Sequence, residues 1–155
     1  MTIRAYTDDD AAGTLAVFLA AVTQTASADY TPEQISAWAG ADERDLASWH
    51  AARAARATVV AVLDAEVVGF TDVDDAGYVD MMFVDPAVVR RGVASALLDH
   101  VAATAVGHGA RELSTHASVT ARPFFERRGF VVVEERRPVV RGVALTNYRM
   151  VRTLG

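Results

Sequence analysis

The stretch that decides the fold of this 155-residue chain is residues 78–98, YVDMMFVDPAVVRRGVASALL. An apolar, β-prone run over 79–84 ends at Asp85-Pro86, which predicts a strand followed by a turn. Two arginines and Gly92 come next, and an amphipathic helix pattern begins at Val93. The sequence therefore predicts a strand that leads, through a short basic loop, into the N-terminus of a helix.

This junction is suited to hold a phosphate group. The first backbone N–H groups of a helix have no partner within the helix, and the helix dipole favours an anion at that end. Gly92 lets the backbone approach a ligand closely, the guanidinium groups of Arg90 and Arg91 flank it, and Ser95 adds a hydroxyl just inside the helix. The triplet Arg-Arg-Gly alone is more typical of a solvated basic pair before an ordinary helix, so this interpretation depends on the flanking residues.

Those flanking residues carry a resemblance to a known family. The window Val89-Arg90-Arg91-Gly92-Val93-Ala94 resembles motif A of the GCN5-related N-acetyltransferases (GNATs), in which the loop and helix grip the pyrophosphate of acetyl-CoA. The glycine and the final small residue match, whereas Val89 stands where the family has Gln or Arg. Residues 120–130, TARPFFERRGF, resemble motif B. The resemblance covers essentially the whole chain and implies one acetyltransferase-like domain over residues 1–155.

The implied fold is α/β, with a mixed and mostly antiparallel sheet and a splayed central strand pair. The hydrophobic pattern of the rest of the chain is consistent with it. We predict strands at 2–6, 58–63, 67–73, 78–84, 112–116, 130–136 and 143–151, and helices at 8–22, 31–38, 45–56, 93–106 and 121–128.

Composition narrows the function further. A net charge of −5 disfavours general nucleic-acid binding, and we expect no membrane partner because the apolar runs are broken before the ~20 residues of a membrane span.

The chain has no cysteine, and all 15 basic residues are arginine, which excludes thiol, Schiff-base and P-loop chemistry. A dinucleotide-binding oxidoreductase is disfavoured because no Gly-x-Gly-x-x-Gly turn occurs. Histidines 50, 100, 108 and 116 lack metal-ligand spacing, so we expect no metal. The first residues do not resemble a signal peptide, which favours a cytoplasmic location.

The resemblance also assigns residues to the cofactor. In the family the strand over 78–84 splays from its neighbour, and the pantetheine arm pairs with backbone groups that here belong to Met82, Phe83 and Val84. One of these N–H groups could polarise the thioester carbonyl. For Ser118, capping of the following helix is the alternative role. The expected cofactor contacts are Met82, Phe83, Val84, Val89, Arg90, Arg91, Gly92, Val93, Ala94, Ser95, Ser118, Phe124, Phe125 and Arg128.

Acetyl transfer to an amine requires a group that takes the amine proton and a proton for the departing thiolate. Asp80 interrupts an apolar strand where relatives carry a glutamate base, so we expect it to act as base or amine anchor. A carboxylate on the open face of the sheet, paired with an arginine, is the equal alternative. Phe125 stands where the family has a tyrosine acid, and it has no proton to give. His116, Tyr148 and Tyr78 are candidate substitutes, although each is more often a structural residue.

The sequence thus predicts an N-acetyltransferase that passes the acetyl group of acetyl-CoA to a primary amine of a small molecule or peptide by direct attack on the thioester. The alternative is a catalytically weak acyl-CoA-binding or sensor module, because Phe125 replaces the usual acid. A homodimer that pairs through an edge strand over 145–151 and a monomer in which that edge is covered are both compatible with the pattern.

Overall fold

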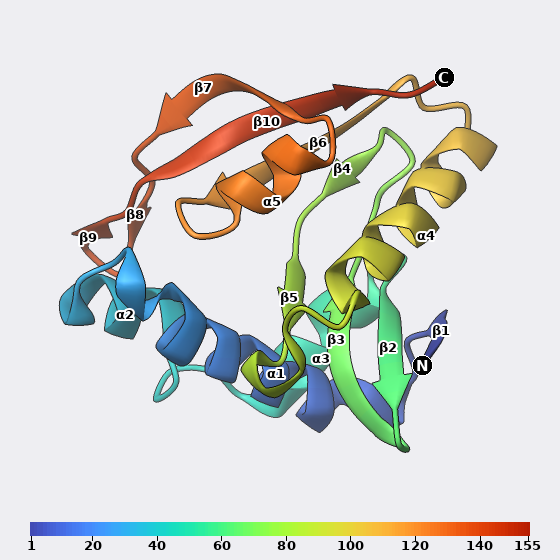
Figure 1. Cartoon of the computed structure of the whole chain (residues 1–155). Helices are drawn as coiled ribbons and strands as arrows, with labels where there is room; N and C mark the ends of the chain where they lie inside the picture. The colour runs from blue at the N-terminus through green and yellow to red at the C-terminus, as the bar shows by residue number, and fades with distance from the viewer.

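The computed structural model describes residues 1–155 and shows the expected α/β architecture (Figure 1). Its strands form two four-stranded sheets and a small hairpin. The first sheet is antiparallel, in the order β1 (Thr2–Ala5), β2 (Val59–Leu63), β3 (Glu66–Thr71) and β5 (Met82–Val84). The second has the order β4 (Tyr78–Val79), β6 (Glu112–Ser118), β10 (Asn147–Thr153) and β7 (Val131–Arg136). Only β4 and β6 run parallel in it. The hairpin joins β8 (Val139–Val140) to β9 (Val143–Ala144).

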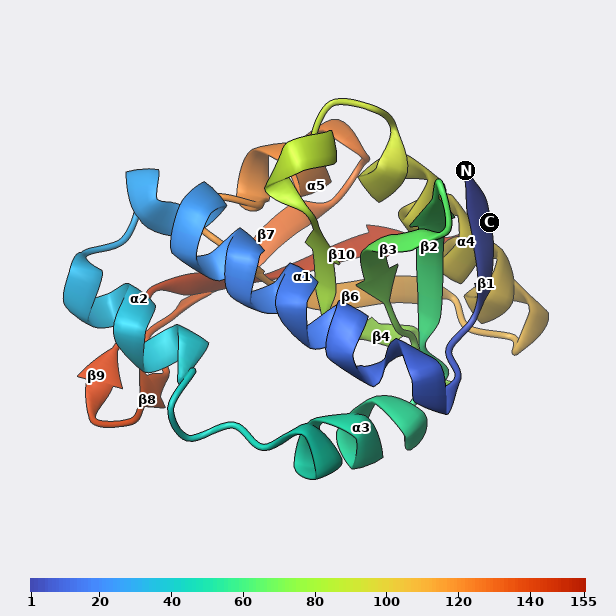
Figure 2. The ribbon, with the colours of Figure 1, turned by 90° about the horizontal axis from the view of Figure 1, so that it is seen from below.

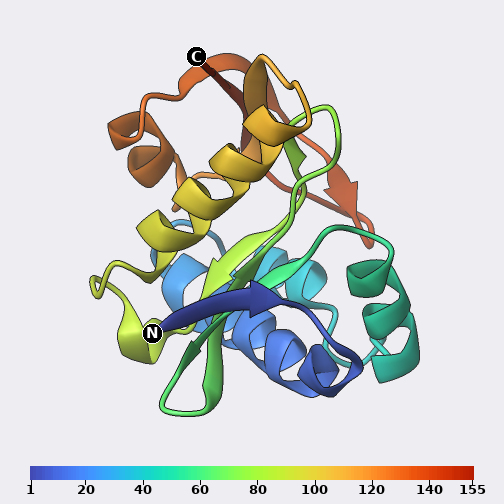
Figure 3. The same ribbon diagram turned by 90° about the vertical axis from the view of Figure 1, so that its right-hand side faces the viewer.

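Helices cover both faces of the first sheet (Figures 2 and 3). α1 (Ala11–Gln24) buries Val17 and Phe18 against one face. α4 (Val93–Gly107) packs on the other, where the absence of a side chain at Gly69 of β3 leaves room for Val93 and Leu97. The remaining helical elements are α2 (Pro32–Ala39), α3 (Leu46–Ala54), α5 (Arg122–Arg127) and the 3₁₀ turns η1 (Asp8–Asp10), η2 (Thr25–Ala28) and η3 (Pro86–Val88).

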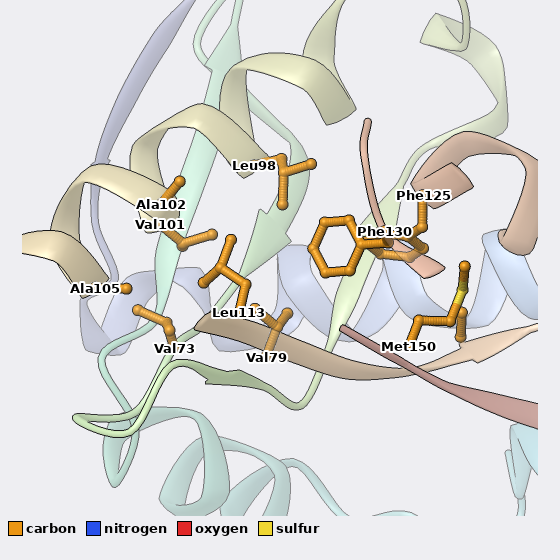
Figure 4. Close-up of a cluster of buried hydrophobic side chains, with 11 residues drawn as sticks. Val73, Val79, Leu98, Val101, Ala102, Ala105, Leu113, Phe125, Phe130 and Met150 are labelled. Atoms are coloured by element: carbon orange, nitrogen blue, oxygen red, sulfur yellow. The ribbon is translucent and has the colours of Figure 1, made fainter. Parts of the chain in front are cut away.

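The largest hydrophobic cluster lies between α4, α5 and the second sheet (Figure 4). Leu98 and Val101 of α4 meet Leu113 of β6, Met150 of β10 and Phe125 of α5, and none of these side chains is more than 4% exposed. Burial of this kind stabilises a fold by about 1.5–3 kcal/mol per large side chain, so the cluster fixes α4 and α5 relative to the sheet.

Two predicted strands are interrupted in the structure. The strand predicted over 78–84 breaks at Asp80-Met81, so that β4 joins the second sheet and β5 joins the first. The strand predicted over 143–151 is divided into β9 and β10, because the buried side chain of Leu145 packs with Ala26 and Tyr30 between the two. Of the two arrangements compatible with residues 145–151, the structure has the covered one, because β10 pairs with β6 on one side and with β7, the outer strand, on the other.

The continuous helical segment Asp8–Ala28 has 21 residues and is apolar enough, by length and composition alone, to cross a membrane. It is longer than the apolar runs anticipated from the sequence. Its residue Phe18 is buried against Trp49 and Phe83, with ring centroids 5.2 and 5.0 Å away. This packing is that of a core helix lying on a sheet.

Candidate active site

A cavity of about 520 Å³ lies where the two sheets separate. β5 is the last strand of the first sheet, so its outer edge is free. β4 pairs with β6 only through Tyr78 and Val79, opposite Ser114 and Thr115, so β6 also has a free edge beyond that point. Residues of both free edges line the cavity, which confirms the predicted splay of the central strands. They are Met82, Phe83 and Val84 from β5 and His116, Ala117 and Ser118 from β6.

One end of the cavity is formed by the basic loop before α4. Val89, Arg90 and Ala94 line it. Arg90 and Gly92 both have left-handed backbones, with φ of +66° and +80°, and a Cβ at Gly92 would meet nothing within 4 Å. The N–H of residue 96 bonds the Gly92 carbonyl at 3.0 Å, so the N–H groups that precede it in α4 have no partner within the helix. Such a loop presents unpaired N–H donors to open space and can bind an anion.

The other predicted loop residues lie beside this wall rather than in it. Arg91 and Gly92 are exposed, and Ser95 is half-buried within α4. Val93 is buried in a hydrophobic cluster with Leu97. Its side chain therefore anchors the helix, and only its backbone N–H is available to a ligand.

Side chains bond four backbone groups at the break between β4 and β5. Thr115 Oγ1 donates to the carbonyl of Val79 (3.0 Å), Thr71 Oγ1 donates to the carbonyl of Met81 (2.8 Å), and the N–H groups of Asp80 and Met81 donate to Asp72 (2.8 and 3.3 Å). These bonds let the chain leave one sheet and join the other without burying an unpaired polar group.

Asp72 is fully buried and lies among charged groups. Its carboxylate is 3.0 Å from Nε of Arg56 and 3.8 Å from Nη1 of Arg53, and Nη2 of Arg53 is 3.9 Å from the Asp80 carboxylate. Burial raises the pKa of Asp72, while the Asp80 N–H and Arg56 oppose that rise. Burial also lowers the pKa of Arg53. Sequence reasoning missed this network. The one feature of the sequence that could have revealed the network is Asp72, an aspartate inside the predicted apolar strand 67–73.

The proposed base, Asp80, lines the cavity, and its side chain is 38% exposed. His116 lines the same cavity from β6, and its Nδ1 lies 3.2 Å from the hydroxyl of Tyr78. Burial and the guanidinium groups of Arg136 and Arg149 lower the pKa of His116, although Asp80 acts in the opposite direction. A neutral imidazole and a carboxylate therefore face the same space.

The residues predicted from motif B are divided. Phe124 and Phe125 both line the cavity, and Phe125 is also buried in the core, where its ring packs against Phe130. Arg127 lines the cavity, whereas Arg128 lies over the ring of Phe124 with its guanidinium carbon 5.9 Å from the centroid. Arg127 is the last residue of α5 and Arg128 is its C-cap, so adjacent arginines lie on the cavity wall and beside it.

Two further predicted residues have clear structural contacts. Ser118 lines the cavity, and its Oγ also accepts the Ala121 N–H at 3.0 Å. Ala121 is itself the N-cap of α5, so this bond holds the turn before the helix and is not the helix cap considered as the alternative role. Tyr148 does not line the cavity. Strand β10 turns it toward α5, where the guanidinium carbon of Arg122 lies 4.6 Å from its ring centroid.

The N-terminal helices close the remaining side of the cavity. Trp38 of α2 lines it, together with residues 21, 25 and 26. Tyr30 connects this wall to the second sheet, because its hydroxyl donates to the Thr146 carbonyl (2.6 Å) and accepts the Val119 N–H (2.9 Å). Thr120 also donates to Asp29 at 2.8 Å. The two halves of the chain are thereby tied together at the mouth of the cavity.

Comparison with known proteins identifies the family. Residues 26–152 match the family model described as acetyltransferase (GNAT) domain. The chain belongs to the GNAT family. The matched range includes every residue of the cavity wall except Ala21 and Thr25, so the GNAT assignment applies to the part of the chain that forms the site.

Individual relatives agree with this assignment. The chain is 45% identical over 148 residues to the uncharacterized N-acetyltransferase YafP of Escherichia coli K12, covering 96% of this chain and 93% of the relative. A crystal structure of a GCN5-related N-acetyltransferase from Rhodopseudomonas palustris is 35% identical, with a TM-score of 0.94 over 99% of this chain and 95% of that one. The YncA structure from Salmonella typhimurium, solved with its cofactor acetyl-CoA, shares the GNAT fold at 20% identity, with a TM-score of 0.69 over 100% and 94% of the two chains.

Proposed function

We propose that this GNAT domain transfers the acetyl group of acetyl-CoA to a primary amine of a small molecule or peptide. The observation that carries the proposal is the cavity between the free edges of β5 and β6, which has an anion-binding loop at one end and two proton-accepting groups in its wall. The acetyl-CoA bound to the YncA structure, which has the same fold, supports this choice of co-substrate.

The residues present fit acetyl-CoA in two places. The free N–H groups at the start of α4, with Arg90 beside them, suit the pyrophosphate, and the open space over Gly92 lets it approach. The free edge of β5 offers N–H and C=O groups to the amide-containing pantetheine arm. The acetyl thioester would then lie near the break at Asp80, where the two sheets separate.

The chemistry follows from the groups at that break. The amine nitrogen attacks the thioester carbonyl, the C–S bond breaks, and CoA leaves as a thiolate. Asp80 can anchor the incoming ammonium group, and the neutral imidazole of His116 can take its proton. A thiol has a pKa of about 8.5, so the thiolate is a fair leaving group even without an enzyme acid.

A catalytically weak acyl-CoA-binding module is the second candidate, because of Phe125. The ring of Phe125 lines the cavity but is only 4% exposed and has no hydroxyl. In such a module the loop and strand edge would bind the cofactor, and transfer to an amine would be slow.

Calorimetric titration with acetyl-CoA and with free CoA tests the binding that both candidates share. We expect saturable binding of both ligands, and absence of binding to either would refute the whole proposal. Thiol release from acetyl-CoA is then measured with a panel of small amines and of peptides that have a free N-terminus. This measurement separates the enzyme from the weak binding module. Turnover with at least one amine is expected for the enzyme. Binding without amine-dependent thiol release across the panel favours the module.

A further inference from the structure

The break between β4 and β5 lies at the cavity, and one buried carboxylate bonds two of its backbone N–H groups. A strand that changes partner leaves backbone groups with no ladder to join. The N–H groups of Asp80 and Met81 are such groups, and both donate to Asp72, at 2.8 and 3.3 Å. Asp72 thus takes the place of the carbonyl groups that a neighbouring strand would supply.

The surroundings of Asp72 hold this carboxylate in one position. A charge with no solvent exposure is costly unless it is paired and hydrogen-bonded. Here two backbone N–H groups and the arginines Arg56 and Arg53 meet that requirement. Arg53 is itself buried and extends from Asp72 to Asp80, with nitrogens 3.8 and 3.9 Å from the two carboxylates. Asp72 is therefore linked to Asp80 in two ways. It accepts the backbone N–H of Asp80, and Arg53 lies between the two carboxylates.

We propose that Asp72 is a positioning residue for the acceptor side of the reaction. It fixes the strand break, and with Arg53 it orients the Asp80 carboxylate toward the cavity. The inference rests on the proposed acetyl transfer, since it assigns Asp72 a role in the use of the amine. The other titratable groups that act on this position are Tyr78 of β4 and His116 of β6, whose pKa values both respond to Asp80.

The first test measures the break itself and needs no substrate. Amide hydrogen exchange of Asp80 and Met81 is compared by NMR in the wild type and in Asp72→Asn. We expect both amides to exchange about tenfold faster or more in the variant, because each loses a carboxylate acceptor. Asp10→Asn is the matched control, since Asp10 is also buried, accepts a backbone N–H and pairs with an arginine, but its carboxylate bonds only Arg4 and Thr7. It should leave exchange at Asp80 and Met81 unchanged.

Arg56→Gln is a second variant in case Asp72→Asn does not fold. The Arg56 side chain is 24% exposed, and glutamine at this position removes the pairing with Asp72 and the bond from Nη2 to the Tyr78 carbonyl (3.2 Å). Exchange at Asp80 and Met81 should rise there too. Unchanged rates in both variants, or in Arg56→Gln alone where Asp72→Asn is unfolded, would overturn the proposal.

The second test measures the reaction with any amine that the wild type acetylates. In Asp72→Asn we expect kcat/KM for the amine to fall by about 10²-fold, as a misplaced catalytic group predicts, while acetyl-CoA affinity changes less than about threefold. The pH profile of kcat/KM should move to lower pH, because Arg53 and Arg56 are left unopposed beside the reacting groups. Equal losses in Asp10→Asn, or an unshifted profile, would reduce Asp72 to a structural role. Failure of the wild type to bind acetyl-CoA would instead refute the proposed function and leave the exchange result standing.

Discussion

Substitution of Gly92 by glutamate should abolish tight acetyl-CoA binding because the new carboxylate repels the cofactor's phosphates. The same substitution at Gly109 is the matched control. Gly92 precedes α4 with φ +80°, and Gly109 follows the same helix with φ +83°. A Cβ at either position would meet nothing within 4 Å. Glutamate therefore imposes the same backbone strain at both sites, about 1–2 kcal/mol for a left-handed residue, and the same change in net charge.

Only the variant at Gly92 places the new carboxylate beside the loop that we expect to hold the pyrophosphate. Two unit charges about 5 Å apart repel by about 3 kcal/mol at an effective dielectric constant of 20, which is about a 10²-fold loss of affinity. Calorimetry of wild type, Gly92→Glu and Gly109→Glu measures it, and thermal unfolding should show similar losses of stability in both variants. The reasoning fails if Gly92→Glu binds acetyl-CoA as the wild type does, or if Gly109→Glu loses as much affinity. Part of the loss at Gly92 should also disappear at high salt, because salt screens exposed charges.

Four other outcomes are expected. The hydrogen bond from Arg4 lowers the pKa of Asp10 in the folded protein. The ionised Asp10 therefore stabilises the fold fully above the pKa of the unfolded state, near 3.8, and this stabilisation is lost as the pH falls below that value. Asp10→Asn should flatten the acid limb of a profile of melting temperature against pH. His116→Gln should remove a kcat/KM ionisation that titrates below pH 6.5, because the pKa of His116 is lowered. Phe125→Tyr should raise thiol release by about tenfold or more if thiolate protonation is limiting, at unchanged acetyl-CoA affinity. Gly69→Ala should destabilise the fold by about 1–3 kcal/mol in chemical denaturation, since its Cβ would lie 3.0 Å from Val93 and 3.1 Å from Leu97.

The junction of strand, turn and helix that precedes α4 could be predicted from sequence because its signals are local. The order of Asp85-Pro86, Gly92 and the amphipathic pattern from Val93 reflects backbone geometry within a few residues, and the structure has a strand, turn and helix there. The free edges of β5 and β6 on either side of the cavity were accessible only through resemblance to a family. No periodicity in residues 78–84 distinguishes a broken strand from a continuous one, because both show the same apolar run.

The residues that the sequence analysis missed act over long range. Asp72 and Arg53 belong to different elements, and Arg53 alone resembles an ordinary surface charge, so the aspartate in the predicted strand 67–73 had no visible partner. The Tyr30 hydroxyl bonds two segments more than 85 residues away along the chain, at Val119 and Thr146. Hydrogen bonds between such distant residues leave no spacing to detect in one sequence.

The cavity and the buried network have one physical cause. Separating β5 from β6 exposes strand edges that a cofactor can use, but it leaves the N–H of Asp80 and the N–H and carbonyl of Met81 outside both sheets. Each would cost about 1–3 kcal/mol if buried and unpaired, a total comparable with the whole stability of a small domain. The side chains of Thr71 and Asp72 supply these partners. The charge of Asp72 in turn requires Arg53 and Arg56. The polar residues behind the cavity are thus a condition of its existence, and the same residues fix where Asp80 meets the acceptor.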